Sequence, residues 1–557
     1  MCRHRLCHLW IDAMKCLLGI FFSLLFIFAA PAAQVVNVQY IHDLIQQRWN
    51  ITVPKNELLT DSSVVANMKY LLRAIDVANY KLNGWQTTNY VDGAYATTAA
   101  ADTVAAQQAV DGLIKFIGFP FKLTTIDTAD SFQFTISAKG TFYINWGDGK
   151  EEFFEQTDTN EQLYTHTYDV PGKYIIELDG KATAYSNGST TPAISFNNNQ
   201  NIAYISGSLG QIFSTLANGT QPKFYYTFGN NPNLTGDIPP ALFSGVAGKP
   251  TKNMFYGTFY GDKKLSGEIP AGLFSGIKGD PMEGVFYRTF ENCSGLSGGI
   301  PDGLFDGLSG PPARDMFHAT FAGCSGLTGN IPSGLFAGIS GAPAQRMYNA
   351  TFSGCSGLTG AIPNALFGRF DGAPQELMFG NTFFSCSGLT GSIPADLFTG
   401  ITGQPAKRMF EGTFNVCTGL TGALSADLFA GLDGVPVEKM FYNTFAGCSG
   451  LSGVLPAGLF AGISGDVAPQ MFYRTFYNCS KLTGIEDGVF GELTGTVQNQ
   501  MFTETFYRNY ALTGDSVKSG GKYLYEIWPD ATKNYVGGMY TSATGLSDYA
   551  SIPDVWK

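Results

Sequence analysis

Histidine and basic side chains are scarce in this sequence. It contains 5 histidines in 557 residues, and its 34 lysines and arginines stand against 45 aspartates and glutamates, a formal net charge of −11. Beyond residue 33 the histidines are His42, His166 and His318, which fall in separate regions and form no zinc-binding or catalytic constellation. The acidic balance argues against nucleic-acid binding, which requires a basic surface.

Motifs that hold cofactors or carry catalysis are also missing. The chain has no glycine-rich loop ending in Gly-Lys-Ser or Gly-Lys-Thr, and its acidic residues lack the spacing of a calcium-binding loop. Residues 295–299 match a Gly-x-Ser-x-Gly nucleophile motif, but other repeats read Gly-Leu-Thr-Gly at this place, so the match is interpreted as coincidence. We therefore expect no enzymatic activity, no cofactor and no bound metal.

A long apolar run occurs only near the N-terminus. Residues 17–30 form this run, Lys15 precedes it, and Ala30-Pro31-Ala32 resembles a cleavage site. A membrane-spanning helix needs about 20 apolar residues, so a secretion signal is favoured over the alternative of a membrane anchor. Either Met1 or Met14 serves as the start of the signal. We expect a secreted or cell-surface protein with no transmembrane segment beyond it.

The chain is rich in one repeated unit. A Thr-Phe pair recurs every 31 residues, with a final step of 30, and leucine, isoleucine, glycine and proline recur at fixed offsets from it. Units of this kind bury their apolar faces only by stacking on their neighbours. The anchor phenylalanines are Phe228, Phe259, Phe290, Phe321, Phe352, Phe383, Phe414, Phe445, Phe476 and Phe506.

Each unit is predicted to contain one short strand and one helix. In the unit that begins at Phe321, the strand covers residues 327–332, because the proline at its end cannot donate to a sheet. The helix covers residues 343–354, where proline suits the first turn and glycine the C-cap. Stacked strands repeat at about 4.8 Å and packed helices at about 8–10 Å, so the strand side should be a concave parallel sheet.

The repeat resembles a known family. The string Thr-Phe-x-x-Cys-x-x-Leu-Thr-Gly-x-Ile-Pro, present at residues 320–332 and 351–363, is similar to the leucine-rich repeats of BspA-type bacterial surface proteins. A threonine before the phenylalanine, a longer unit and a glycine within the strand depart from that family. The resemblance implies an α/β leucine-rich-repeat solenoid of ten units of about 31 residues, and adhesion to proteins of a host or a neighbouring cell.

Cysteines occupy one position in consecutive units, three residues after the anchor phenylalanine. Asn231, Asp262 and Asn509 take this position in the outer units. A thiol or a short polar side chain there can bond the backbone of a neighbouring coil, so a buried file of free thiols is predicted. Disulfides and a metal ladder are the alternatives, which the odd number of cysteines and a helical spacing of about 8–10 Å disfavour. The file comprises Cys293, Cys324, Cys355, Cys386, Cys417, Cys448 and Cys479.

The region before the repeats contains a second resemblance. Trp-Gly-Asp-Gly at residues 146–149, His-x-Tyr at 166–168 and Pro-Gly-x-Tyr at 171–174 resemble the landmarks of a polycystic-kidney-disease (PKD)-type, immunoglobulin-like domain. This resemblance implies a β-sandwich that acts as a spacer or an interaction module. The aspartate and histidine of these landmarks are interpreted as a turn residue and a core residue.

The predicted organisation has six parts. Apolar stripes at helical spacing predict a helical module after the signal, and the segments that flank the repeats are predicted to close the two ends of the array. In chain order we expect a signal peptide, a helical module, a PKD-like β-sandwich, an N-terminal cap, the leucine-rich-repeat solenoid and a degenerate C-terminal cap, at residues 1–33, 34–118, 119–186, 187–222, 223–518 and 519–557.

Two sets of side chains are candidates for ligand contact. Tyrosines gather near the predicted helix, where they either cover its surface or supply the aromatic contacts that usually dominate recognition. Threonines form a file of hydroxyls on the predicted concave strand, which suits an extended polymer. We expect a protein partner at the tyrosines and a glycan at the hydroxyls. The candidates are Tyr256, Tyr260, Tyr287, Tyr442, Tyr473, Tyr477 and Tyr507, together with Thr328, Thr359 and Thr390.

The sequence therefore favours an exported recognition or adhesion protein. Its expected partners are proteins or glycans on a host or neighbouring cell surface, and nucleic acid is not among them. Two alternatives remain open: a glycan-binding accessory protein of an exported polysaccharide system, and a component that packs with itself into a surface layer.

Overall fold

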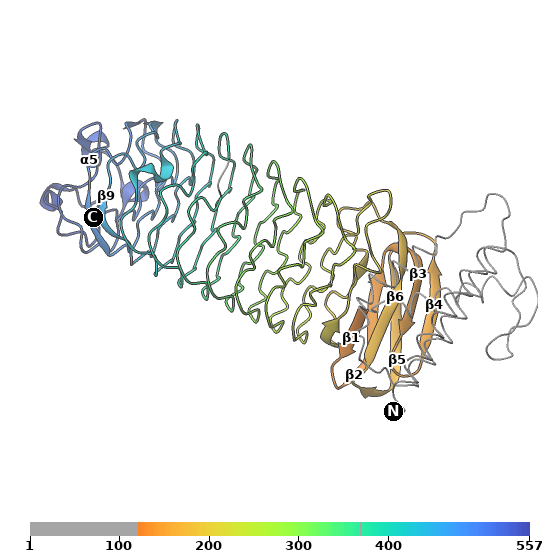
Figure 1. Ribbon diagram of the computed structural model, residues 1–557. Helices are drawn as coiled ribbons and strands as arrows, with labels where there is room; N and C mark the ends of the chain where they lie inside the picture. The colour runs from red at the N-terminus through yellow and green to blue at the C-terminus, as the bar shows by residue number, and fades with distance from the viewer. Residues whose placement is uncertain (1–120, 368–369) are drawn as a thin grey trace, which may run out of the picture. The chain divides into compact units, whose positions relative to one another are not determined.

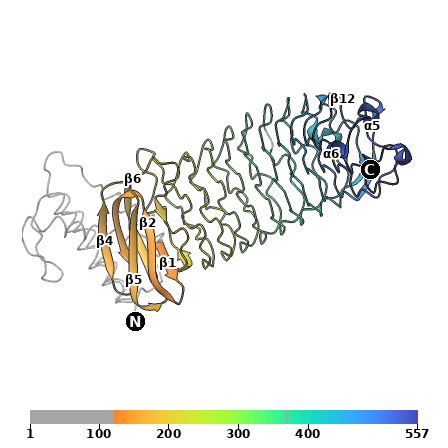
Figure 2. The same ribbon diagram turned by 180° about the vertical axis from the view of Figure 1, so that it is seen from behind.

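The described part of the protein, seen in a computed structural model, comprises residues 121–367 and 370–557. The signal peptide and the helical module predicted for residues 1–33 and 34–118 lie outside these residues. A β-sandwich comes first in the described chain, and a row of coils follows it (Figures 1 and 2). Within the described residues no helix is both long and apolar enough to span a membrane.

Two antiparallel sheets build the sandwich, with the strand orders β4-β3-β6-β1-β8 and β5-β2-β7. Apolar and polar residues alternate along the strands, as a half-buried sheet requires. In β2, Phe132, Phe134 and Ile136 are buried and the residues between them are more exposed. The buried Trp146 lies 6.0 Å from the ring of Phe134 and fills the space between the sheets. The strands are β1 (Phe121–Thr125), β2 (Ala129–Ile136), β3 (Ala138–Asn145), β4 (Glu151–Gln156), β5 (Gln162–Gly172), β6 (Ile175–Tyr185), β7 (Ile194–Ser195) and β8 (Ile202–Ser206).

The edge strands β7 and β8 join the sandwich to the first coil. β7 pairs with β2 and β8 pairs with β1, so the segment predicted as irregular cap coils completes both sheets. Next to β7, the backbone N–H of Phe196 donates to Thr227, and beside β8 the N–H of Thr235 donates to Ala203. The ring of Phe196 stacks on Phe228 at 5.5 Å. The apolar core is therefore continuous from the sandwich into the coils.

Backbone hydrogen bonds to the neighbouring coils hold each coil on three sides. On the anchor side the N–H of Phe321 donates to Thr351, and on the next side the N–H of Thr328 donates to Gly298. On the third side the N–H of Ser340 donates to Gly310. These bonds link residues about one repeat apart, so every inner coil uses its neighbours to satisfy its own backbone.

The α/β leucine-rich-repeat prediction is wrong, because the predicted helix is absent from the coils. In residues 343–354 alternate N–H groups donate to the next coil, as Phe352 does to Thr382, and the others close tight turns, as Thr351 does to Tyr348. Every fourth residue is left-handed, including Ala350 with φ 54°. A helix needs right-handed residues throughout and bonds between residues four apart. The segment is therefore a run of turns.

The long parallel sheet predicted for the other side is also wrong. Adjacent coils meet there mostly through isolated bridges, such as Gly391 with Leu420, and only short strand pairs form near the C-terminus. The strand and helix layers that were expected to give a concave face are therefore not present. The remaining elements are β9 (Ser452–Leu455), β10 (Gly465–Asp466), β11 (Lys481–Ile485), β12 (Leu493–Thr494), β13 (Lys518–Ser519), β14 (Lys522–Tyr523), α5 (Leu524–Ile527), α6 (Lys533–Val536), and the short 3₁₀ turns η1 (Ala426–Phe429) and η2 (Tyr549–Ser551).

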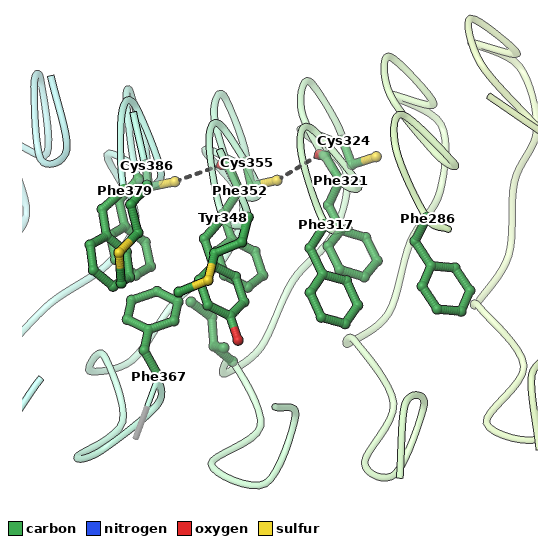
Figure 3. Close-up of a cluster of buried hydrophobic side chains, with 14 of the residues drawn as sticks. Phe286, Phe317, Phe321, Cys324, Tyr348, Phe352, Cys355, Phe367, Phe379 and Cys386 are labelled. Carbon is green, nitrogen blue, oxygen red and sulfur yellow. Dashed lines mark hydrogen bonds between the residues drawn. The ribbon is translucent and has the colours of Figure 1, made fainter. Parts of the chain in front are cut away.

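Columns of stacked aromatic rings run through the interior of the coils (Figure 3). The anchor rings of Phe321 and Phe352 lie 5.8 Å apart with an interplanar angle of 5°. In a second column Tyr348 lies 5.8 Å from Phe317 and 6.0 Å from Phe379. All five side chains are buried, so stacking converts one repeated sequence into one continuous core.

Buried threonines and cysteines add side-chain bonds between coils. The hydroxyl of Thr320 donates to the carbonyl of Phe286 at 3.0 Å, and the thiol of Cys324 donates to that of Phe290 at 2.9 Å. The repeat cysteines are free, as predicted, and burial raises the pKa of Cys355 to about 12, which keeps its thiol a donor. The helical spacing that was used to disfavour disulfides is wrong, because the coils lack the predicted helix. Each thiol instead has a carbonyl partner in the preceding coil.

The column of anchor rings continues beyond Phe506. Tyr540 takes the anchor position in the segment predicted as a degenerate cap, and its ring stacks on Phe506 at 6.0 Å. The N–H of Tyr540 donates to the carbonyl of Trp556, whose side chain is fully buried. Phe506 therefore has an aromatic neighbour on both sides.

Candidate binding surface

The candidate tyrosines lie on the anchor side of the coils. The run of turns there points pairs of residues alternately inward and outward, which leaves all the candidate tyrosines half-buried and partly accessible. They gather in two groups. We call Tyr225, Tyr226, Tyr256, Tyr260 and Tyr287 the N-terminal tyrosine patch, and Tyr442, Tyr473, Tyr477 and Tyr507 the C-terminal tyrosine patch.

The sequence analysis missed two members of the N-terminal patch. Tyr225 stands three residues before Phe228, which is the offset of Tyr256 from its own anchor, so the period could have identified it. Tyr226 has no tyrosine at its offset in the next coil, where Gly257 leaves room for its ring. A Cβ atom at Gly257 would lie 2.7 Å from that ring. Tyr226 therefore depends on a contact between coils that no single repeat reveals.

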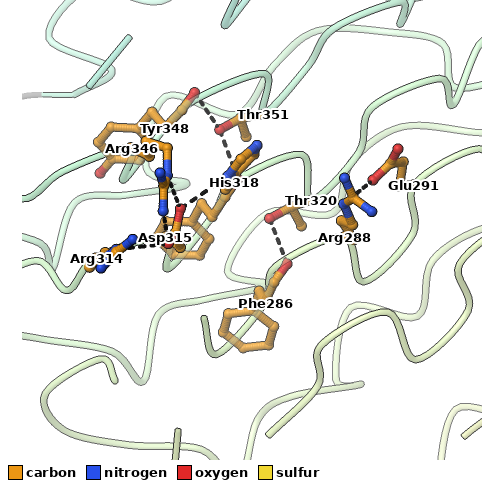
Figure 4. Close-up of polar contacts among 11 residues, drawn as sticks. Phe286, Arg288, Glu291, Arg314, Asp315, His318, Thr320, Arg346, Tyr348 and Thr351 are labelled. Carbon is orange, nitrogen blue, oxygen red and sulfur yellow. Dashed lines mark hydrogen bonds and ion pairs between the residues drawn. The ribbon is translucent and has the colours of Figure 1, made fainter. Parts of the chain in front are cut away.

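The rings of the N-terminal patch pack mainly on one another. Tyr256 lies 4.4 Å from Tyr287, and the guanidinium of Arg288 lies 5.2 Å from the Tyr287 ring. Arg288 Nε also lies 3.0 Å from a carboxylate oxygen of Glu291 (Figure 4). Burial raises the pKa of Glu291, with the charge of Arg288 acting in the opposite direction. The cation and the rings of this patch are thus largely occupied by internal contacts.

A charged cluster follows the N-terminal patch (Figure 4). The carboxylate of Asp315 accepts two hydrogen bonds from Arg346, at 2.7 and 2.8 Å, and lies 3.0 Å from Nδ1 of His318. Burial acts to raise the pKa of Asp315, but the hydrogen bonds from Arg346 and His318 outweigh it and lower this pKa. The His318 ring stacks on Tyr287 at 4.3 Å. His318 is therefore a structural partner of this cluster.

Mostly small or polar residues separate the two patches. At the offset of Tyr256 the middle coils carry Asn349 and Gly380, and at the offset of Tyr260 they carry Ala322 and Ser353. These side chains offer little area for contact. The middle coils also carry the partly buried Phe384 at the offset of Tyr260, so it is the tyrosines at these two offsets that are confined to the two patches.

The C-terminal patch consists of ring pairs joined by an arginine. Tyr442 stacks on Tyr473 at 4.8 Å with an interplanar angle of 10°, and Tyr477 stacks on Tyr507 at 5.1 Å with an angle of 3°. The guanidinium of Arg474 lies 5.0 Å from the Tyr473 ring and 5.1 Å from the Tyr477 ring. The four rings thus form one surface that crosses three successive coils.

The hydroxyl file lies on another side of the coils. Thr328, Thr359 and Thr390 are exposed, and the N–H of each donates to a glycine of the preceding coil at 2.7 to 2.8 Å. Their hydroxyls are short and uncharged and recur once per coil. They can bond a neutral hydroxylated polymer, although the predicted parallel sheet beneath them is not formed.

The landmark residues of the sandwich are internal. Nε2 of His166 lies 2.9 Å from Asp148, and its ring stacks on Trp146 at 4.8 Å. The hydroxyl of Tyr168 donates to the carbonyl of Trp146. The contact between His166 and Asp148 therefore holds the turn at residues 146–149 against the core. Across residues 121–367 and 370–557, no group of three or more His, Cys, Asp or Glu side chains could hold a metal ion.

No protein-family model, no curated protein and no solved structure matches this chain. The resemblances to BspA-type repeats and to PKD-type domains therefore rest on their sequence motifs.

Proposed function

We propose that the protein is an exported, non-catalytic recognition or adhesion protein that binds proteins on a host or neighbouring cell surface through its tyrosine patches. The apolar run at residues 17–30 supports export, and the BspA-like motif supports a role at a surface. The partner is a protein because tyrosine and arginine are the residues that most often anchor protein interfaces.

One observation carries this proposal: the interior of the coils is nearly constant, and the partly accessible tyrosines on the anchor side gather in two places. Anchor rings, buried threonines and buried cysteines repeat from coil to coil and are engaged in bonds between coils. At the outward offsets, by contrast, Tyr442 and Tyr473 replace the Asn349 and Gly380 of the middle coils. A constant scaffold with a locally varied surface is the arrangement of a binding protein.

The test uses the full chain and a panel of cell-surface proteins and glycans. The double variant Tyr442→Ala with Tyr473→Ala should weaken binding to a captured protein at least about tenfold, since central tyrosines often contribute 2 kcal/mol or more. The matched control is Thr328→Lys with Thr359→Lys, on another side of the coils. Binding that survives the tyrosine variant and fails in the control would contradict the proposal.

The exposed hydroxyl file favours a second candidate function, the binding of a glycan. Thr328, Thr359 and Thr390 present one hydroxyl per coil without nearby charge, which suits a neutral polysaccharide laid along the coils. Under this candidate the lysine variant abolishes binding to a neutral polysaccharide in the same panel and the tyrosine variant does not.

A further inference from the structure

We propose that the C-terminal tyrosine patch docks an acidic segment of a protein partner. This inference rests on the proposed function, because it names the partner chemistry for one of the two patches. The contrast in how the two patches use their cations is the observation behind it.

The cations beside the N-terminal patch form ion pairs with carboxylates of the same chain. Arg288 is paired with Glu291 at 3.0 Å, and Lys252 is paired with Glu283 at 2.9 Å. A partner carboxylate would have to compete with these internal pairs. The positive charges of Arg288 and Lys252 are therefore already balanced by carboxylates of the same chain.

The C-terminal patch keeps cations without a carboxylate partner. The guanidinium of Arg508 lies 5.4 Å from the Tyr507 ring, and Nζ of Lys439 lies 5.5 Å from the Tyr442 ring. Neither group forms an ion pair with any residue that the structure describes. The third cation, Arg474, is shared between two rings and Glu504, at 2.5 Å. Two of the three cations are therefore free to meet a partner.

The cations form a diagonal row across three successive coils. Relative to its own anchor phenylalanine, Lys439 stands six residues before, Arg474 two before and Arg508 two after. The stacked tyrosines lie between them along the same diagonal. An extended segment laid along this row presents alternate side chains to it, because successive side chains of a strand point to opposite faces. Acidic residues at alternate positions can therefore pair with the cations while the rings pack against the segment.

Charge argues for a short acidic segment over a uniformly anionic polymer. The protein as a whole carries a formal charge of −11, so a long polyanion gains at the patch and is repelled elsewhere. Screening confines both effects to about 10 Å at ordinary ionic strength, and a short segment feels mainly the local cations. Guanidinium groups on aromatic faces, as Arg474 and Arg508 are placed, also favour carboxylate recognition.

The test uses the full chain and a labelled short peptide in which glutamate alternates with serine, with a glutamine-for-glutamate peptide as the uncharged match. Anisotropy should show binding of the glutamate peptide, a loss of roughly tenfold or more for the glutamine peptide, and weakening with added salt. The double variant Lys439→Ala with Arg508→Ala should lose roughly tenfold in affinity. The control Lys249→Ala with Lys264→Ala removes two cations elsewhere and should bind as the parent does.

Each other outcome overturns the inference. No binding of the glutamate peptide, or equal loss in the patch and control variants, removes the acidic partner from this patch. Equal binding of polygalacturonate shows a general anion site in place of a protein-docking site. The proposed function is judged separately, on a captured surface protein. It stands if binding is lost on Tyr442→Ala with Tyr473→Ala and kept on Lys439→Ala with Arg508→Ala. It falls if binding survives both Tyr442→Ala with Tyr473→Ala and the matching change in the N-terminal patch, Tyr256→Ala with Tyr287→Ala.

Discussion

The sandwich and the coils satisfy their backbones in different ways. In the sandwich, ladders of backbone hydrogen bonds join β2 to β5 and β3 to β6 over most of their length. In the coils, single backbone bonds reach the neighbouring coil, and the buried hydroxyls and thiols supply further bonds to its carbonyls. A threonine or cysteine of the coils is thus part of the main-chain network, which explains why these residues repeat as strictly as the apolar ones.

The largest expected effect tests whether the coils behave as a row of dependent units. Phe352→Ala removes a buried ring that lies 5.8 Å from one anchor ring and 5.7 Å from the next. The free energy of unfolding should fall by about 3–5 kcal/mol. Hydrogen exchange should rise in the adjacent coils and stay unchanged in β2 and β6. A uniform rise across the sandwich and the coils would contradict the distinction between them.

The next effect compares one threonine from each region. The hydroxyl of Thr351 donates to Phe317 at 3.0 Å and also lies 2.9 Å from the carbonyl of Tyr348, all in the interior. Thr351→Val should destabilise the protein by about 1–2 kcal/mol, since the buried carbonyl of Phe317 loses this bond between coils and keeps only the N–H of Thr320. The matched change in the sandwich, Thr183→Val, affects an exposed hydroxyl and should cost less than about 0.5 kcal/mol. Denaturant unfolding measures both, and equal losses would show that the hydroxyls play no special part in the coils.

A buried acid in the thiol file predicts a pH effect confined to the coils. Asp262 is fully buried, one carboxylate oxygen accepts the N–H of Asn231, and the other has no partner among the described residues. Burial raises the pKa of Asp262 well above its ordinary value. The folded state therefore keeps this proton where the unfolded state loses it, so the stability contributed by Asp262 falls as pH rises above about 4.

Asp262→Asn should remove this pH dependence. At the same offset, the side-chain amide of Asn509 donates to Phe476 at 2.8 Å, so an asparagine fits this file. We expect the variant to be more stable than the parent by about 1–2 kcal/mol near neutral pH and similar to it at acidic pH. Thermal unfolding followed across pH measures the difference. A constant gap at all pH values would mean that folding does not raise the pKa of Asp262.

The smallest expected effect concerns the one tyrosine in an otherwise phenylalanine column. The ring of Tyr348 stacks like its neighbours, and its hydroxyl is buried without a hydrogen-bond partner in the described structure. Tyr348→Phe should stabilise the protein by about 1 kcal/mol, because it removes a desolvated polar group and keeps the ring. A loss of stability on denaturant unfolding would show that the hydroxyl does have a partner.

Several features of the coils could be predicted from the sequence because they depend on one residue and its period. The anchor residues Phe321 and Phe352 are buried, and Cys324 and Cys355 are free thiols in one file. The helix at residues 343–354 could not be excluded in this way. A run of turns with a four-residue period also buries Tyr348 and Phe352, four residues apart, so its pattern is close to that of a helix.

The candidate binding surface, too, could be predicted from the sequence only in part. Tyrosines at a repeated offset, such as Tyr256 and Tyr287, were found from the period, whereas Tyr226 was missed because it needs the space above a glycine of the next coil. The sequence also could not predict that Arg288 pairs with Glu291, or that Arg508 has no such pair among the residues that the structure describes. Ion pairs depend on side-chain placement within a few ångströms, which periodicity does not specify.

The sequence by itself determined the repeat length, the residues that face inward and the scarcity of groups for metal binding or catalysis. These properties follow from which side chains are apolar and how often they recur. Only the tertiary structure decided the backbone conformation of the coils, because the N–H of Phe352 finds its partner in Thr382 of the next coil and not within its own turn. It also decided which tyrosines share a surface with cations that form no ion pair within the described residues, since that surface is assembled from three coils.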